Sequence, residues 1–417
     1  MAAHAPGDGA HRPTRARRRH RWAYLVAGGV ALVVLAGAGA VWVHRTSGAA
    51  STLSACGDHG SVPADDAAAP SASASAPSPQ VRSGTAVDSS TRASRHALRR
   101  MGGLGFTQGD QPMTLGSARL TTLFRGIAAT GATIVRLDLN WAAIEPSGPD
   151  SYDLTHTLAV YRAATAHGLT VLPVLTGVPG WASSAPGGCG PAFAAFMDRA
   201  SPPMLAAGVR AVEIGNEVNT TGMSPQAYTH DLLVPGARAF RAAGITAGVT
   251  VGVISTGLAP ARTGGGTWSP PDFLRGVYAA DGGAYLDAVG MHPYSWPDAP
   301  TADVAWNWLR GATDVRAVMV ANGDADKAMW ATEFGFPTNS DRGVSDAQQA
   351  RYLAVGARIW GARAWAGPIV IYSYQDLDTG ARDPEDNFGV RDTDGTAKPA
   401  YDVVRDLAAA AAAQGEG

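Results

Sequence analysis

Two glutamates each stand near the end of a short apolar run in this 417-residue chain. Glu217 closes the run VEIGNE, which begins at Val212, and Glu333 lies in the run MWATEFG, which begins at Met329. Such runs are typical of buried β-strands, and the last residue of a strand in a parallel barrel points into the mouth where the loops gather. A carboxylate pair there suits cleavage of a glycosidic bond, because one carboxyl can donate a proton while the other attacks. The pair therefore indicates an enzyme.

A repeating βα pattern predicts the elements that position this pair. Eight short β-like runs alternate with helical patterns, and they begin near Met101, Thr133, Leu169, Val209, Gly248, Leu286, Lys327 and Gly367. Glycines stand where we expect the intervening helices to end, at positions 131, 168, 208, 244 and 367. A β-propeller has a similar period, but its blades lack helices such as the pattern from Gln348 to Arg363. The repeat predicts an α/β fold, a (β/α)8 TIM barrel.

Alternation along these runs places polar side chains inside the barrel. Side chains on a strand point to opposite faces in turn, so Glu213 and Glu217 share one face. The same parity groups polar residues on two other runs, Arg136 with Asp138 and Asn140, and His292 with Tyr294. An unpaired charge in such an interior costs several kcal/mol. We therefore expect Glu213, which lies deeper than Glu217, to pair with a cation such as Arg136.

These residues together resemble those of a clan A glycoside hydrolase, family 39 first and family 5 close behind. The resemblance covers residues 101–410 and rests on Asn216-Glu217 in the fourth run, Glu333 in the seventh, Arg136 in the second and His292-Pro293-Tyr294 in the sixth. It implies a retaining mechanism in which Glu217 is the acid/base and Glu333 is the nucleophile. The eighth run departs from the family pattern, because residues 371–375 read IYSYQ where the family often has a tryptophan as the floor of the sugar site.

The resemblance also implies roles for neighbouring residues. Arg136 would hold Glu333 ionised, Asn216 would bind the sugar 2-hydroxyl, and Tyr294 would donate to Glu333. We expect His292 to be a hydrogen-bonding residue of the site, since no second histidine or cysteine stands at metal-ligand spacing near it. Trp181 and Trp296 are the tryptophans that we expect to stack on sugar rings. No metal or cofactor is implied.

The first 45 residues predict a membrane anchor. Six arginines between Arg12 and Arg21 precede an uncharged run over residues 22–43, which is long enough as a helix to cross a bilayer. The positive-inside bias places residues 1–21 in the cytoplasm and everything after residue 45 outside. Cleavage after the small residues 38–40 stays open as the alternative, which would give a secreted protein.

Residues 44–98 predict a disordered linker between this anchor and a catalytic domain over 99–417. The segment is rich in Ala, Ser, Pro and Gly and cannot bury enough apolar surface to fold. It contains Cys56, one of two cysteines; the other, Cys189, lies in a Gly-rich loop. A bridge between them would fasten a flexible tether, so we expect none. Residues 53–56 read LSAC, which looks like a lipoprotein processing signal, but polar residues separate this signal from the apolar run. We therefore interpret Cys56 as a cysteine of the linker and not as a site of lipid attachment.

Charge and composition narrow the choice of partner. Residues 101–417 hold 21 basic and 30 acidic residues, a net charge of −9, which argues against nucleic acid. We expect the substrate to be a β-linked polysaccharide of the cell envelope or its surroundings, and no obligate protein partner is indicated. The acidic stretch over residues 383–394 predicts a solvated loop. Two other functions stay open: a transglycosylase with the same site, and a barrel that binds glycan without cutting it.

Overall fold

The computed structural model describes residues 56, 93–95, 98 and 103–415, and they contain a closed barrel of eight parallel strands. Neighbouring strands follow the order of the sequence, and β1 closes the barrel by pairing with β8. The (β/α)8 prediction is confirmed. The strands are β1 (Leu104–Thr107), β2 (Ile134–Asn140), β3 (Thr170–Thr176), β4 (Ala211–Glu213), β5 (Gly252–Ile254), β6 (Ala288–Met291), β7 (Ala328–Phe334) and β8 (Ala366–Tyr372).

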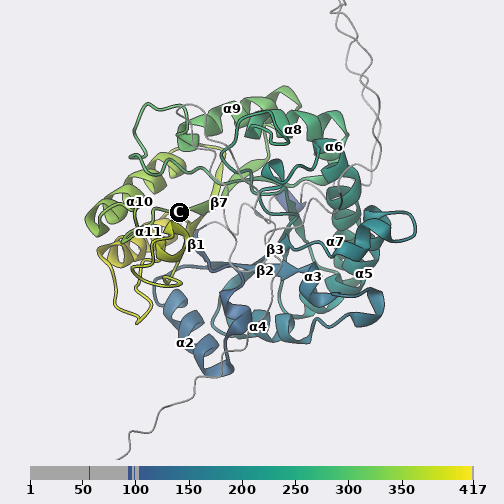
Figure 1. Ribbon diagram of the computed structural model, residues 1–417, viewed down its shortest axis with the longest axis horizontal. Helices are drawn as coiled ribbons and strands as arrows, with labels where there is room; N and C mark the ends of the chain where they lie inside the picture. Colours follow the sequence, from purple (N-terminus) through teal and green to yellow (C-terminus); the bar gives the residue numbers. More distant parts are fainter. Residues whose placement is uncertain (1–55, 57–92, 96–97, 99–102, 416–417) are drawn as a thin grey trace, which may run out of the picture. The chain divides into compact units, whose positions relative to one another are not determined.

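The longer helices follow one another around the outside of this barrel in chain order (Figure 1). The helices are α2 (Ser117–Ala128), α3 (Trp141–Ile144), α4 (Thr155–Thr165), α5 (Cys189–Ala206), α6 (Pro225–Ala227), α7 (Val234–Ala247), α8 (Pro270–Ala279), α9 (Trp308–Ala321), α10 (Asp346–Gly361) and α11 (Pro399–Gly415), with a π-helical turn (Tyr228–Leu233) before α7. The start of α10 shows how the sequence sets these bounds, because Ser345 and Gln348 form a reciprocal capping box there.

The glycines expected at helix ends divide into two groups. Gly131, Gly168 and Gly208 follow α2, α4 and α5 with φ of 83°, 77° and 93°, as the sequence predicts. The prediction is wrong for the other two. Gly244 lies inside α7, which continues to the left-handed Gly248, and Gly367 lies inside β8.

The end of the barrel lumen opposite the mouth is filled by apolar side chains. They come from the beginnings of several strands and from one residue before β1: Leu98, Ile134, Leu172, Ala211, Ile254, Ala288, Ala328 and Trp330. Burying these side chains removes apolar surface from water and stabilises the closed barrel. Farther along the strands, Arg136 and Glu213 therefore lie above an apolar floor.

The chain before β1 takes part in this floor. Leu98 is only 1% exposed, and a side chain at Gly252, the first residue of β5, would collide with it. Ser94 is also buried, and Arg95 forms an ion pair of 2.5 Å with Asp326, just before β7. Arg95 and Leu98 of the expected linker thus contact the end of the barrel opposite the mouth.

Cys56 and Cys189 form a disulfide across 133 residues of sequence, so the prediction of no bridge is wrong. Both cysteines are buried in the main apolar core, and their Cα atoms are 5.5 Å apart, within the usual range for a disulfide. Cys189 is the first residue of α5 and follows the loop after β3, on the mouth side of the barrel. The bridge therefore attaches residue 56 to the barrel.

The expected anchor over residues 22–43 and most of the linker lie outside the described residues. Within the described part of the chain, no helix combines the length and apolar character needed to cross a bilayer.

We predict that Leu98→Ala lowers the free energy of unfolding by about 2–5 kcal/mol, because it empties part of a packed floor. Urea titration of the full chain, followed by tryptophan fluorescence, measures the change. Val320→Ala is the matched control, since this α9 side chain is 50% exposed and its loss costs about 0.5 kcal/mol or less. Equal effects of the two substitutions would contradict the packing of Leu98.

We predict that reducing the disulfide lowers stability by about 2–5 kcal/mol, because a cross-link over a long loop restricts the unfolded chain. Urea titrations with and without dithiothreitol measure the loss. Cys56→Ser should show the lower stability in both conditions. Detection of two free thiols in the untreated native chain would contradict this prediction.

Candidate active site

Glu217 and Glu333 meet in the mouth of the barrel. Glu333 lies on β7, whereas β4 already ends at Glu213 and the backbone then leaves the strand geometry. Gly215 has φ of 92°, and a side chain there would collide with Val218. Glu217 itself adopts a left-handed conformation with φ of 50°. Both carboxylates are buried, and one oxygen of each lies within 4.8 Å of the other.

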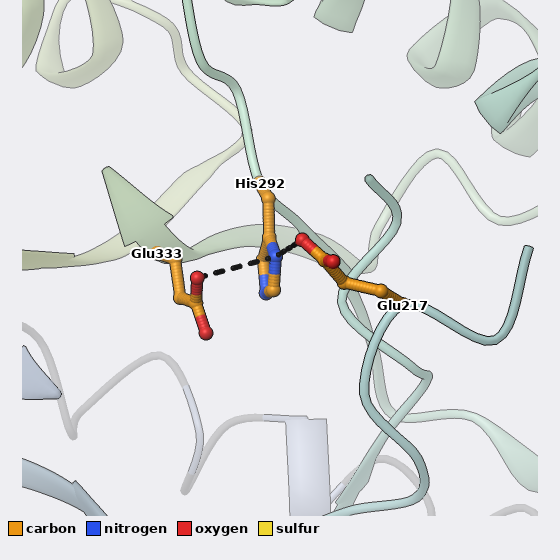
Figure 2. A group of neighbouring side chains, drawn as sticks. All are labelled: Glu217, His292 and Glu333. Atoms are coloured by element: carbon orange, nitrogen blue, oxygen red, sulfur yellow. Dashed lines mark hydrogen bonds and ion pairs between the residues drawn. The ribbon is translucent and has the colours of Figure 1, made fainter. Parts of the chain in front are cut away.

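His292 lies between the two carboxylates (Figure 2). Its Nδ1 atom is 2.7 Å from Glu217 Oε1 and 3.5 Å from Glu333 Oε2. When both carboxylates are ionised, Nδ1 is the ring nitrogen that carries the hydrogen, and it donates to Glu217. The ring is fully buried and fits only because residue 257 is glycine, where a Cβ would lie 2.1 Å from Nε2.

Arg136, on β2, makes hydrogen bonds to residues of β4, of the segment after β4 and of β7. Its Nε donates to Glu213 Oε2 at 2.6 Å, Nη1 to Glu333 Oε1 at 2.7 Å, and Nη2 to Asn216 Oδ1 at 2.7 Å. Burial opposes the charge, but the carboxylates of Glu213 and Glu333 outweigh it and raise the pKa of Arg136 above its usual value. Glu213 also accepts from Thr332. The predicted pairing of Glu213 with Arg136 is confirmed.

Tyr294 holds the other oxygen of Glu333, since its hydroxyl donates to Oε2 at 2.9 Å. Burial and the charge of Glu333 raise the pKa of Tyr294 well above its usual value, so the hydroxyl stays protonated. The ring of Phe388 packs against Tyr294 and Tyr372, with ring centres 6.1 and 4.9 Å apart. Glu333 thus accepts from Arg136 on one oxygen and from Tyr294 on the other.

The structure brings together six of the eight residues that the sequence singles out: Glu217, Glu333, Arg136, Asn216, His292 and Tyr294. The two tryptophans are placed differently. Trp181 remains partly exposed, and its indole nitrogen donates to the Glu145 carbonyl. Trp296 is only 8% exposed, with the Arg342 guanidinium 4.7 Å from its ring. Little of the Trp296 ring is open to a sugar.

Tyr372 and Glu385 also reach the site, although the sequence did not single them out. Tyr372 ends β8, and its hydroxyl donates to Glu385 Oε2 at 3.1 Å. Glu385 is 8% exposed, so the prediction that residues 383–394 form a solvated loop is wrong at this position. Its charge contributes to the raised pKa of Tyr294. Strand parity could have identified Tyr372, but no pattern in the sequence marks Glu385.

A divalent cation is poorly suited to the carboxylate pair. Glu217, His292 and Glu333 do present ligand atoms within 4.8 Å of one another. However, the oxygens of Glu333 already accept from Arg136 and Tyr294. A guanidinium 2.7 Å from Glu333 would also repel a second positive charge.

Several solved structures that this barrel resembles are glycoside hydrolases. A family 39 glycoside hydrolase from Bacteroides cellulosilyticus WH2 matches with 22% identity and a TM-score of 0.56 over 74% of this chain and 64% of that one. An exo-β-1,4-mannosidase from Opitutaceae bacterium strain TAV5 matches with 18% identity and a TM-score of 0.56 over 75% and 60%. A GH5_18 protein from Streptomyces cattleya matches with 14% identity and a TM-score of 0.56 over 74% and 80%.

These likenesses show the fold: the chain shares its (β/α)8 barrel with a family 39 glycoside hydrolase and with a GH5_18 protein. The chain spans less than two thirds of the length of the first two proteins. No family model and no curated protein matches the sequence.

Asp138 provides a prediction on pH dependence. Burial and the neighbouring Asp110 raise the pKa of Asp138 to about 7, although Arg136 and a hydrogen bond from Thr176 oppose the shift. An unfolded aspartate titrates near pH 4, so the folded state binds this proton more tightly. Ionising Asp138 therefore costs stability as the pH rises from about 4 through about 7.

We predict that Asp138→Asn gains about 1–4 kcal/mol relative to the wild type when the pH rises from 4 to 8, because the amide does not ionise. Urea titrations of both chains at the two pH values measure this difference. A difference between the chains that is the same at pH 4 and pH 8 would contradict the prediction.

Proposed function

We propose that this chain is a retaining glycoside hydrolase in which Glu333 is the nucleophile and Glu217 is the acid/base. The observation that supports this most directly is the separation of the carboxylates, which is within 4.8 Å between one oxygen of each. Retaining enzymes hold their carboxyl groups about 5–5.5 Å apart, whereas inverting enzymes need about 6.5–9.5 Å to admit a water molecule. The separation favours direct attack.

The surroundings of the two carboxylates support different roles. Glu333 accepts from Arg136 and from Tyr294, and such donors stabilise an ionised carboxylate and aim it. Glu217 lacks a guanidinium partner among the described contacts, and its oxygen receives only the His292 ring nitrogen at 2.7 Å. Glu217 is therefore the better candidate to hold a proton and release it.

The proposed reaction has two steps. An oxygen of Glu333 attacks the anomeric carbon while the glycosidic bond breaks and Glu217 protonates the departing oxygen. Water then attacks the same carbon, Glu217 removes its proton, and the bond to Glu333 breaks. A sugar hydroxyl that replaces this water would give transglycosylation, so product analysis distinguishes the two outcomes.

We propose a β-linked polysaccharide outside the cytoplasm as the substrate. The related exo-β-1,4-mannosidase and the GH5_18 structure, whose ligand is Manβ1-4GlcNAc, make β-1,4-linked hexopyranosides the first substrates to test. A disulfide is stable mainly in oxidising compartments, which supports a location outside the cytoplasm. The anchor expected over residues 22–43 would hold the enzyme at the membrane.

We predict that Glu333→Gln lowers kcat at least about 1,000-fold on every substrate, whereas Glu217→Gln is most harmful where the leaving group needs a proton. The assay compares dinitrophenyl β-glycosides, whose leaving group departs unprotonated, with β-1,4-linked oligosaccharides. Glu217→Gln should retain much more bond cleavage on the former.

Asp402→Asn serves as the control, because this carboxylate is exposed on α11 and pairs only with its neighbour Arg405 in the described contacts. It should leave both activities unchanged. Full activity in either glutamine variant, with folding verified by circular dichroism, would remove that glutamate from the mechanism.

A further inference from the structure

Trp306 is an exposed indole on the catalytic side of the barrel. Three large apolar side chains among the described residues are strongly exposed: Ile245 at 77%, Val320 at 50% and Trp306 at 45%. Ile245 and Val320 lie near the C-terminal ends of α7 and α9, which turn back toward the beginnings of the strands. Trp306 instead precedes the start of α9, in the segment that leaves β6 at the mouth. It alone of the three lies on the side of the barrel that carries Glu217 and Glu333.

The segment that carries Trp306 is fixed from within. Asn307 is buried, and its amide nitrogen donates to the carbonyls of Pro300 and Ala302 at 2.9 and 2.8 Å. The backbone N–H of Trp308 donates to the Tyr294 carbonyl at 3.0 Å. Because the Tyr294 hydroxyl binds Glu333, this segment is joined to the residue that holds the proposed nucleophile.

The indole itself is also oriented. Its Nε1 donates to Asp298 Oδ2 at 2.8 Å, so the polar edge of the ring is satisfied within the same segment. What remains accessible is largely apolar ring surface, held in place before any ligand arrives. An exposed indole that is rigid loses little conformational entropy when it binds, which suits a recognition surface.

We propose that Trp306 forms a distal subsite that stacks against a pyranose ring of a long glycan. The inference rests on the proposed function and extends it from the cleaved bond to a sugar farther along the chain. One face of a pyranose presents C–H groups, which pack well on an aromatic ring whose polar atom is already paired. The enzyme should therefore favour oligosaccharides that reach the rim over short aryl glycosides.

The test compares kcat/KM of the full chain on p-nitrophenyl β-glycosides and on β-1,4-linked hexasaccharides of mannose, glucose, galactose and xylose. Trp306→Ala should lower the value for the cleaved hexasaccharide about tenfold, mainly through KM, and leave the aryl glycoside unchanged. Trp306→Phe should recover part of the loss. Ile245→Ala, an exposed apolar side chain at the opposite end, should change neither substrate.

The outcomes separate this inference from the proposed function. A wild-type chain that cleaves both substrates while Trp306→Ala affects neither, or affects both equally, would overturn the distal subsite alone. A wild-type chain that cleaves no glycoside, together with a Glu333→Gln chain that binds no hexasaccharide in calorimetry, would overturn both.

Discussion

The site depends on one buried guanidinium. Arg136 reaches from β2 to Glu213 on β4, Asn216 beyond that strand and Glu333 on β7, and all three contacts are 2.6–2.7 Å long. Removing one partner of such a buried ion pair costs about 3–5 kcal/mol, because the other charge is left without compensation. The same contacts that neutralise the interior also fix the direction of Glu333. A single side chain therefore both neutralises the buried carboxylates and holds Glu333 in the position that the proposed mechanism requires.

Strand periodicity made much of this arrangement predictable. A parity of two places Arg136 and Glu213 on the inner faces of their strands, and a closed barrel then brings them into contact. The contact between Tyr294 and Glu333 was expected from the family resemblance and is present at 2.9 Å. The pairing of Arg136 with Glu213 was predictable because both residues lie on regular strands, β2 and β4, whose side chains alternate between two faces.

Features that depend on loop conformation could not be predicted from strand periodicity. Glu385 enters the site because the chain after β8 folds back, and its sequence looks like any acidic surface segment. The ring of Trp296 is covered by Arg342, which comes from the loop after β7. The disulfide brings the Cα atoms of two cysteines to 5.5 Å from each other, a proximity that their sequence separation of 133 does not reveal. Each of these contacts joins segments that no local pattern relates.

The central claim is that Arg136 and Tyr294 hold Glu333 as the nucleophile of a covalent mechanism. The most direct measurement is mass spectrometry of proteolytic peptides after incubation with 2-deoxy-2-fluoro-β-glycosyl fluorides of mannose, glucose and galactose, which slow breakdown of a glycosyl-enzyme. The account predicts one added fluorosugar, attached at Glu333, and none in the Glu333→Gln chain. A sugar attached at Glu217 or Glu385 would contradict it, as would hydrolysis of natural glycans with inversion at the anomeric carbon.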